Sequence, residues 1–261
     1  MLKFSRGNAK LDLLEAIVGG QVWTFSLLSG HACPYAKDCL SKAIRDKNGK
    51  TTIQDGPHTL FRCFSASAEA MYPATYNARD NNTQLLRSAL NTQAMAQLIG
   101  DSLPAKAKCI RIHVGGDFFN QHYFDAWMSV ASDFPSKLFY AYTKSLPFWI
   151  DARSRKIIPK NVSLTASRGG YRDKLISEKK LRQAVVIADP AICAAIIKSG
   201  QSDIVPSGKY KGWEIDHDDS HAALPELRKQ SFALLIHGTQ PKETESAKAK
   251  KILNGVGSYS K

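Results

Sequence analysis

The chain has 261 residues, 43% of them hydrophobic, which is ordinary for a globular protein. No apolar run approaches the roughly 20 residues that span a bilayer, and the polar start at Met1 lacks the apolar core of a signal peptide, which excludes a membrane partner and predicts a cytoplasmic protein. Lys and Arg outnumber Asp and Glu by 13. That excess favours nucleic acid or an anionic small molecule as partner, although a well-solvated surface explains it equally well.

Short apolar runs alternate with helical patterns along most of the chain. Six runs are predicted strands: residues 21–28, 109–114, 137–143, 162–166, 184–188 and 231–237. This alternation predicts a parallel sheet with helices packed outside it. A polar insertion at residues 46–57 and a charged C-terminal tail at residues 242–261 lie outside the pattern. We therefore expect one α/β domain over residues 1–261, a partial (β/α)6 TIM-like barrel.

Three of the five cysteines lie near the end of the first strand. Cys33 and Cys39 follow that strand directly, and Cys63 follows the polar insertion. Thiolates suit iron–sulfur clusters and zinc, and three of them leave one iron of a [4Fe-4S] cluster open to a substrate. We therefore predict such a cluster at the mouth of the barrel. Structural zinc with His31 or His58 as fourth ligand is an alternative, and buried free cysteines are another.

The other two cysteines have different predicted environments. Cys109 begins the second strand, at the end opposite the expected ligand site, and is predicted to lie in the core. Cys193 follows the fifth strand and is a candidate fourth ligand of the cluster, although its neighbours form an apolar helix face that would also accept a buried thiol.

Polar and glycine residues mark the ends of several predicted strands, where parallel α/β sheets bind ligands. The second strand ends at Gly115, Gly116 and Asp117. Glycine permits close approach of a ligand, and the carboxylate can hold an ammonium group or a cation, or cap the next segment. Lys144 and Arg168 follow the third and fourth strands and can bind a carboxylate or phosphate. A solvated strand end is the plainer interpretation of both cations.

Basic residues are dense between Arg153 and Arg182, and the aromatic residues Phe148, Trp149 and Tyr171 lie among them or just before them. Cations interleaved with stacking residues suit single-stranded nucleic acid. A charged, solvated outer helix explains the same pattern.

Five blocks of sequence together resemble the phage gene product 88 family: FSLLSGHACPYAKDC, RCFSASAEA, HVGGDFF, FYAYTKS and SFALLIHG. The resemblance runs over most of the chain and implies a bacteriophage protein that works in the cytoplasm of the host cell. Its motifs identify no reaction.

More distantly, the arrangement resembles radical S-adenosylmethionine enzymes, which are partial (β/α)6 barrels with three cluster cysteines after the first strand. This resemblance implies that Gly115, Gly116 and Asp117 receive the amino group of S-adenosylmethionine, and that an electron donor is a partner. The chain departs from the pattern because a long insertion displaces Cys63. We expect an iron–sulfur protein, either a redox or radical-type enzyme or, alternatively, a nucleic-acid-binding phage protein with a structural cluster or zinc.

Overall fold

The computed structural model describes residues 1–7 and 11–254. Its strands and helices follow in chain order: β1 (Ser5–Arg6), α1 (Asp12–Val18), β2 (Gln21–Thr24), β3 (Ser41–Arg45), β4 (Thr51–Asp55), α2 (Phe64–Met71), α3 (Pro73–Ser88), α4 (Thr92–Ser102), β5 (Ala107–Ile112), α5 (Gln121–Asp133), β6 (Leu138–Thr143), α6 (Leu146–Ser154), β7 (Val162–Ser167), α7 (Lys174–Glu178), β8 (Gln183–Ile187), α8 (Pro190–Ser199), α9 (Ser220–Ala223), the 3₁₀ turn η2 (Pro225–Leu227), β9 (Phe232–Leu235) and α10 (Glu245–Ile252).

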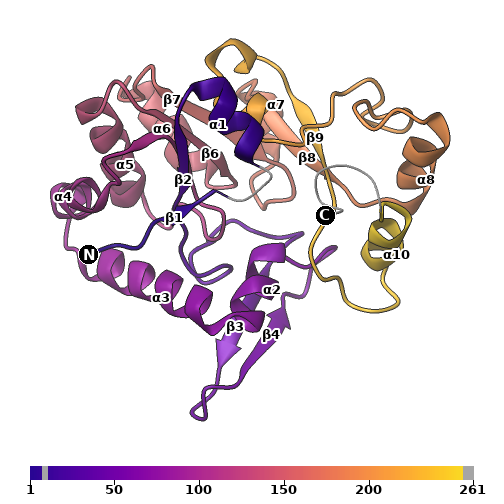
Figure 1. The fold of residues 1–261 in the computed structure, drawn as a ribbon, viewed down its shortest axis with the longest axis horizontal. Helices are drawn as coiled ribbons and strands as arrows, with labels where there is room; N and C mark the ends of the chain where they lie inside the picture. The colour runs from indigo at the N-terminus through magenta and orange to yellow at the C-terminus, as the bar shows by residue number, and fades with distance from the viewer. Residues whose placement is uncertain (8–10, 255–261) are drawn as a thin grey trace.

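The centre of the molecule is a seven-stranded sheet in the order β1-β2-β5-β6-β7-β8-β9. From β2 to β9 each strand runs parallel to its neighbour, and β1 pairs antiparallel with β2 at the edge. The sheet curls into a half-barrel with helices around it (Figure 1). The prediction of a mixed α/β fold with a parallel sheet is confirmed, and the strands fall within or overlap the six predicted ranges.

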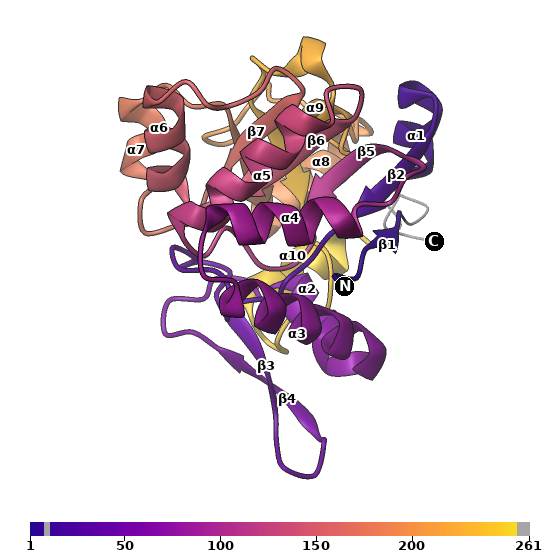
Figure 2. The same cartoon turned by 90° about the vertical axis from the view of Figure 1, so that its left-hand side faces the viewer.

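The outer face of the sheet carries the largest apolar core. In β6, alternate residues Phe139 and Ala141 face this core, where they meet Trp127 of α5. Helices α4 and α5 lie across that face, as Figure 2 shows. Asn120 accepts a hydrogen bond from the Tyr123 amide at 2.8 Å and so caps α5. Burial of each large side chain here contributes about 1.5–3 kcal/mol.

The inner face of the half-barrel is filled by the segment that leads into α9. Asp219 is fully buried there. Its Oδ2 atom accepts hydrogen bonds from Arg111 at 2.6 Å and Tyr140 at 2.9 Å, and its Oδ1 atom accepts one from Tyr142 at 3.2 Å. These side chains alternate along β5 and β6 with the outward-facing core residues, as the two-residue period of a strand requires. A buried charged network thus lies beside the smaller apolar cluster on this side, which includes Val22, Cys109 and Phe232.

The polar insertion forms the antiparallel hairpin β3–β4, which begins at Ser41, before the predicted residue 46. The hairpin projects from the body of the molecule in Figures 1 and 2. Its inward face is held to α3, because the Arg45 guanidinium stacks 3.9 Å from the centre of the Tyr76 ring and donates to Asn77 at 2.6 Å. Because Arg45 pairs with Thr51 next to the turn, these contacts hold the turn end of the hairpin to the start of α3.

The charged C-terminal segment was expected to be a tail, but α10 packs against α8 through Ala249 and Leu253, which are buried. The remainder of the predicted tail, residues 255–261, lies outside the described residues. That residues 1–261 form a single domain stays a prediction.

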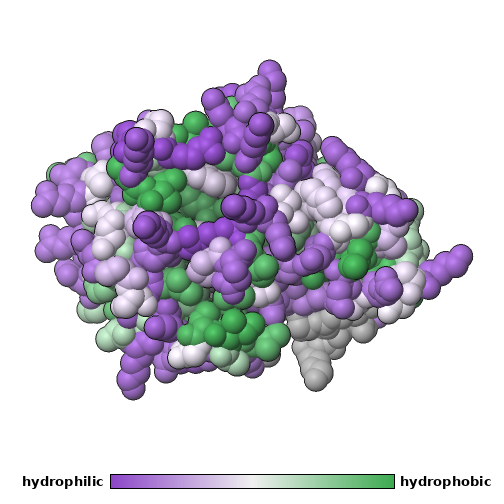
Figure 3. Space-filling view, turned by 90° about the horizontal axis from the view of Figure 1, so that it is seen from above, coloured by the Kyte–Doolittle hydropathy of each residue, from purple (hydrophilic) through white to green (hydrophobic). Residues whose placement is uncertain are grey.

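The surface is mainly hydrophilic, with separate apolar patches, on the face seen from above in Figure 3. Leu13 and Ile17 of α1 are among the exposed apolar side chains, at 57% and 49%. None of the helices within the described ranges is long and apolar enough to cross a membrane.

Candidate ligand-binding site at the strand ends

A cavity of about 550 Å³ lies at the carboxyl ends of the parallel strands. Its wall comes from β5 to β9 and from two segments that cross the strand ends, residues 29–40, which we call the Cys loop, and residues 61–64. Arg6, Leu11, Thr24 and Asp219 complete the wall. The volume falls within the range of small-molecule sites. The sequence-based expectation that the strand ends meet around one site agrees with this position.

The Cys loop is held across the mouth of the cavity by backbone hydrogen bonds. The amides of Lys37 and Asp38 both donate to the Gly169 carbonyl, at 3.2 and 2.9 Å, and the Tyr171 amide donates to the Tyr35 carbonyl at 3.0 Å. The loop that leaves β2 is therefore attached to the loop that leaves β7, three strands along the sheet.

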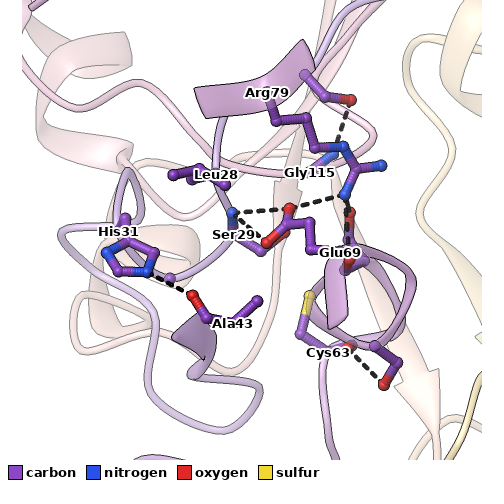
Figure 4. Close-up of polar contacts among 12 residues, drawn as sticks. Leu28, Ser29, His31, Ala43, Cys63, Glu69, Arg79 and Gly115 are labelled. Carbon is purple, nitrogen blue, oxygen red and sulfur yellow. Dashed lines mark hydrogen bonds and ion pairs between the residues drawn. The ribbon is translucent and has the colours of Figure 1, made fainter. Parts of the chain in front are cut away.

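A buried ion pair holds the start of the Cys loop from the other side (Figure 4). The Glu69 carboxylate of α2 is fully buried and accepts hydrogen bonds from the Ser29 amide at 3.0 Å, the Ser29 hydroxyl at 2.7 Å and Arg79 Nη1 at 2.7 Å. Arg79 of α3 also donates to the Ser65 hydroxyl at 2.6 Å. These contacts join the Cys loop, α2 and α3 at the edge of the cavity.

The two glycines after β5 are required by the packing of the protein itself. A Cβ atom on Gly115 would lie 2.3 Å from the Ser65 hydroxyl, and one on Gly116 would lie 2.7 Å from the Leu27 Cβ. Gly116 also has a φ of +82°, which favours glycine. Both residues line the cavity, but their small size admits side chains of neighbouring elements, whereas the sequence suggested close approach of a ligand.

Asp117 is buried and organises the neighbouring strand end. Its carboxylate accepts hydrogen bonds from its neighbour Phe118 at 2.7 Å, the Thr143 hydroxyl at 2.6 Å and the Lys144 amide at 2.8 Å. Burial raises the pKa of Asp117, and these hydrogen bonds oppose the rise. The carboxylate thus couples the end of β5 to the end of β6. Its predicted role as receptor for an amine stays a prediction.

Lys144 differs from the other Lys and Arg residues that line the cavity. Those others are each paired with a carboxylate: Arg6 with Glu15, Arg62 with Asp55 and Arg111 with Asp219. Lys144 is only 8% exposed. Its ammonium group donates to the Ser167 hydroxyl at 2.6 Å and the Arg168 carbonyl at 3.1 Å, and no carboxylate of the described chain lies within ion-pair distance of it. The charge of Lys144 lowers the pKa of Asp117 by a Coulombic interaction, without a direct ion pair between the two side chains.

The Arg168 side chain is not among the groups that line the cavity. Its Nε donates to Gln183 at 2.8 Å, and its guanidinium lies 3.9 Å from Asp173. Arg168 therefore takes part in the site through its carbonyl group, which accepts from Lys144.

The prediction of a metal-binding cluster is wrong. Cys33, Cys39 and Cys63 all line the cavity, but across residues 1–7 and 11–254 no group of three or more His, Cys, Asp or Glu side chains could hold a metal ion. The three thiols stand on different elements, two on the Cys loop and one at the N-cap of α2, and surround the space without converging. The same finding removes the zinc alternative.

Burial sets the protonation of two of the three thiols. Burial, with the charges of Asp117 and Cys63 added, raises the pKa of Cys33 well above its ordinary value. Burial and the neighbouring Cys39 raise the pKa of Cys63 to about 11. At neutral pH both groups are therefore uncharged thiols. They form a weakly polar wall.

The other two cysteines lie in the interior, away from the cavity wall. Cys193, the candidate fourth ligand, is fully buried in the core between α8 and the sheet. Cys109 is also fully buried, as predicted.

Sequence reasoning did not identify two groups that shape the site. Arg111 lies inside the apolar strand CIRIHV, and a charged residue in a buried strand is a visible signal of a buried partner.

His113 is the second of these groups. It has a φ of +68°, and its ring packs against Phe118 and Tyr123 in the core. Burial lowers the pKa of His113 to about 3, so its imidazole is neutral. No sequence signal indicated that this side chain turns away from the strand's inner face.

Comparison with known proteins gives one family and no close relative. The model of the family described as Gene product 88 matches residues 2–255. Searches of curated proteins and of solved structures found no match. The comparisons therefore support the first of the two resemblances seen in the sequence and give no support to the one with radical S-adenosylmethionine enzymes. Since the match extends over nearly the whole sequence, this chain belongs to the Gene product 88 family.

Proposed function

We propose that the cavity at the strand ends binds a small anionic molecule whose negative charge meets the ammonium group of Lys144. The observation that carries the proposal is the surroundings of Lys144: a nearly buried cation that borders the cavity and donates only to neutral oxygen atoms. Burying a charge without a partner is costly, so an anion in the cavity would stabilise the bound state.

The donor count of Lys144 supports this proposal. An ammonium group has three N–H donors, and two of them have acceptors in Ser167 and Arg168. A ligand oxygen can accept the third. A hydrogen bond to a charged group contributes about 1.5–3 kcal/mol.

The neighbouring strand ends would hold Lys144 in position for this role. Asp117 fixes the Lys144 backbone through its amide, and Gly115 and Gly116 allow α2 and the segment after β2 to pack closely behind the cavity wall. We propose that the half-barrel is of the (β/α)6 TIM-like kind, in which ligands bind at this end of the strands. In the reducing cytoplasm of a host cell, which we propose as the compartment, the thiols of the wall would stay reduced.

Calorimetric titration with inorganic phosphate and pyrophosphate at low ionic strength tests the proposal. We expect Lys144→Gln, which keeps a donor for Ser167 but removes the charge, to bind about 10–100-fold more weakly than the unaltered chain. Lys174→Gln is the matched control, because Lys174 is an exposed lysine 3.3 Å from Glu178. Lys144→Arg should retain binding if the charge is what matters. Equal affinity of the unaltered chain and Lys144→Gln would contradict the proposal.

The same titration can include S-adenosylmethionine, the predicted ligand that carries an amine and a carboxylate. Its carboxylate would meet Lys144, and its amine would need the Asp117 oxygen that accepts one hydrogen bond, Oδ2. Because Asp117 already has three donors, we expect S-adenosylmethionine to bind through its carboxylate and to lose affinity in Lys144→Gln.

A further inference from the structure

We infer that the ligand of the cavity is an amphipathic carboxylic acid, whose carboxylate meets Lys144 and whose apolar body packs against Val186 and Leu234. This inference rests on the proposed anion site and adds the chemical class of the ligand. It depends on a second part of the cavity wall, which is apolar and plays no part in binding the charge.

Two apolar side chains of the sheet line the cavity and are only partly covered by the protein. Val186 of β8 and Leu234 of β9 are register partners, so they lie side by side on one face of the sheet. Both are half-buried, although the residues on either side of each in its strand are buried. Apolar surface that lines a cavity beside a few polar groups is typical of small-molecule sites.

The register of the sheet places this apolar pair within reach of Lys144. The Lys144 ammonium group donates to Ser167 Oγ at 2.6 Å, and Ser167 of β7 is the register partner of Ala184 of β8. Val186 follows Ala184 by two residues, so both side chains lie on the same face as Ser167. One strand spacing and two residues of rise put the Cα atoms of Ser167 and Val186 about 8 Å apart. A short-chain carboxylic acid spans this distance.

The segment of residues 61–64 extends the apolar wall. Phe61 and Phe64 both line the cavity and are half-buried. A Cβ atom on Gly238 would lie 2.5 Å from the Phe64 Cβ, so this segment packs closely on the chain that leaves β9. Lys144 and Ser167 lie at the ends of the neighbouring strands β6 and β7. The cavity therefore presents an apolar wall next to its cation, as an amphipathic ligand requires.

The charges around the cavity suit a ligand with a single negative charge. Lys144 has one N–H donor left for a ligand, and the other Lys and Arg residues of the wall are paired with carboxylates. The Asp117 carboxylate, which also lines the cavity, repels additional negative charge. At neutral pH a carboxylate carries one negative charge, whereas a phosphate monoester carries about 1.5–2. A carboxylate is therefore the better match.

The test compares acetate with hexanoate, which share the carboxylate and differ in the apolar body, by calorimetric titration. In the unaltered chain we expect hexanoate to bind about 10–100-fold more tightly, since each buried methylene group contributes about fourfold. Lys144→Gln should weaken the binding of both acids. Val186→Thr, which puts a hydroxyl group in the apolar wall, should weaken hexanoate about 5–10-fold and leave acetate unchanged. Leu234→Ala should have the same selective effect.

Val185→Thr is the matched control, because Val185 is the neighbouring residue of β8, packs in the core that includes Cys193 and does not line the cavity. It should leave the ratio of the two affinities unchanged. This ratio does not depend on the fraction of protein that is folded, so it remains a valid measure in a destabilised variant.

The outcomes separate this inference from the proposal on which it rests. If phosphate and acetate bind through Lys144 but hexanoate binds no more tightly than acetate, the amphipathic ligand is overturned and the anion site stands. The same holds if Val186→Thr and Leu234→Ala both leave the ratio of affinities unchanged, or if hexanoate binding is insensitive to Lys144→Gln. If phosphate, acetate and hexanoate all fail to bind the unaltered chain, both are overturned.

Discussion

Gly116 and Gly49 have almost the same backbone conformation, with φ of +82° and +80°, but different surroundings. A Cβ atom on Gly116 would lie 2.7 Å from the Leu27 Cβ, whereas one on Gly49, at the hairpin turn, would have no neighbour within 4 Å. Substitution of Gly49 measures only the conformational cost of a side chain at positive φ. Substitution of Gly116 adds the steric cost of placing that side chain against Leu27 in the cavity wall.

We expect Gly49→Ala to lower the free energy of unfolding by about 1 kcal/mol, the cost of φ > 0 for alanine. Gly116→Ala should cost about 1–3 kcal/mol more, because overpacking against Leu27 is added. Urea denaturation of the two variants measures both values. Equal losses would mean that Leu27 moves aside freely and that Gly116 does not determine the packing of the wall.

At the scale of elements, the buried Glu69–Arg79 pair joins α2 and α3 to the Cys loop. Removing one member of a buried ion pair leaves the other charge unpaired and costs about 3–5 kcal/mol. We expect Glu69→Gln to reduce the free energy of unfolding by that amount. Glu245→Gln, which removes an exposed pair with Lys248 on α10, should cost less than about 1 kcal/mol. Similar losses in the two variants would show that the buried pair does not hold the Cys loop.

The segment that fills the half-barrel gives a pH-dependent prediction. The carboxylates of Asp216 and Glu214 raise the pKa of His221 to about 9, and His221 Nε2 lies 2.6 Å from Glu214. Because the pKa of His221 is higher in the folded protein, its protonated imidazole stabilises the folded state. This stabilisation is complete below the ordinary histidine pKa of about 6.5 and is lost as pH rises toward 9. Since Glu214 is 57% exposed, water weakens its ion pair with His221, and we expect the pair to contribute about 1–2 kcal/mol to the free energy of unfolding.

The measurement is the free energy of unfolding of the unaltered chain and of His221→Gln at pH 6 and pH 8.5. We expect the difference between the two proteins to be about 1–2 kcal/mol larger at pH 6. The comparison cancels groups that titrate alike in both proteins, including the buried thiols. A difference that is constant across this range would refute the assigned pKa of His221.

Elements with a local signal were predictable from the sequence, and contacts between distant segments were not. The apolar runs gave all six parallel strands, because a buried parallel strand is hydrophobic along its length. The first was predicted four residues too long. Residues Phe25 to Leu28 lie outside the regular ladder, although the Phe25 amide still donates to the Arg111 carbonyl of β5.

The error about the cysteines has the same origin. Their order along the chain placed Cys33, Cys39 and Cys63 near one strand end, and all three do line the cavity. Whether they converge depends on where α2 docks, which Glu69 and Arg79 determine. Glu69 and Arg79 stand on two different helices, and no local pattern in the sequence shows that their charged side chains meet beside the Cys loop.

At the scale of the whole molecule, the positive charge and the cavity point to the same class of ligand. The chain carries 36 basic and 23 acidic residues, and the cations on the cavity wall other than Lys144 are neutralised by paired carboxylates. The general charge would raise the rate at which anions reach the protein, and Lys144 would select the position at which one binds. Added salt should therefore slow the association of the anion, while the bound anion still lies at Lys144.

The most direct measurement of the central claim is a crystal structure with arsenate, an anomalously scattering analogue of phosphate. We predict an anomalous peak in the cavity at hydrogen-bonding distance from the Lys144 ammonium group, and none there in crystals of Lys144→Gln. Peaks confined to exposed lysines and arginines, with none at Lys144, would contradict the proposal that this cavity is an anion site.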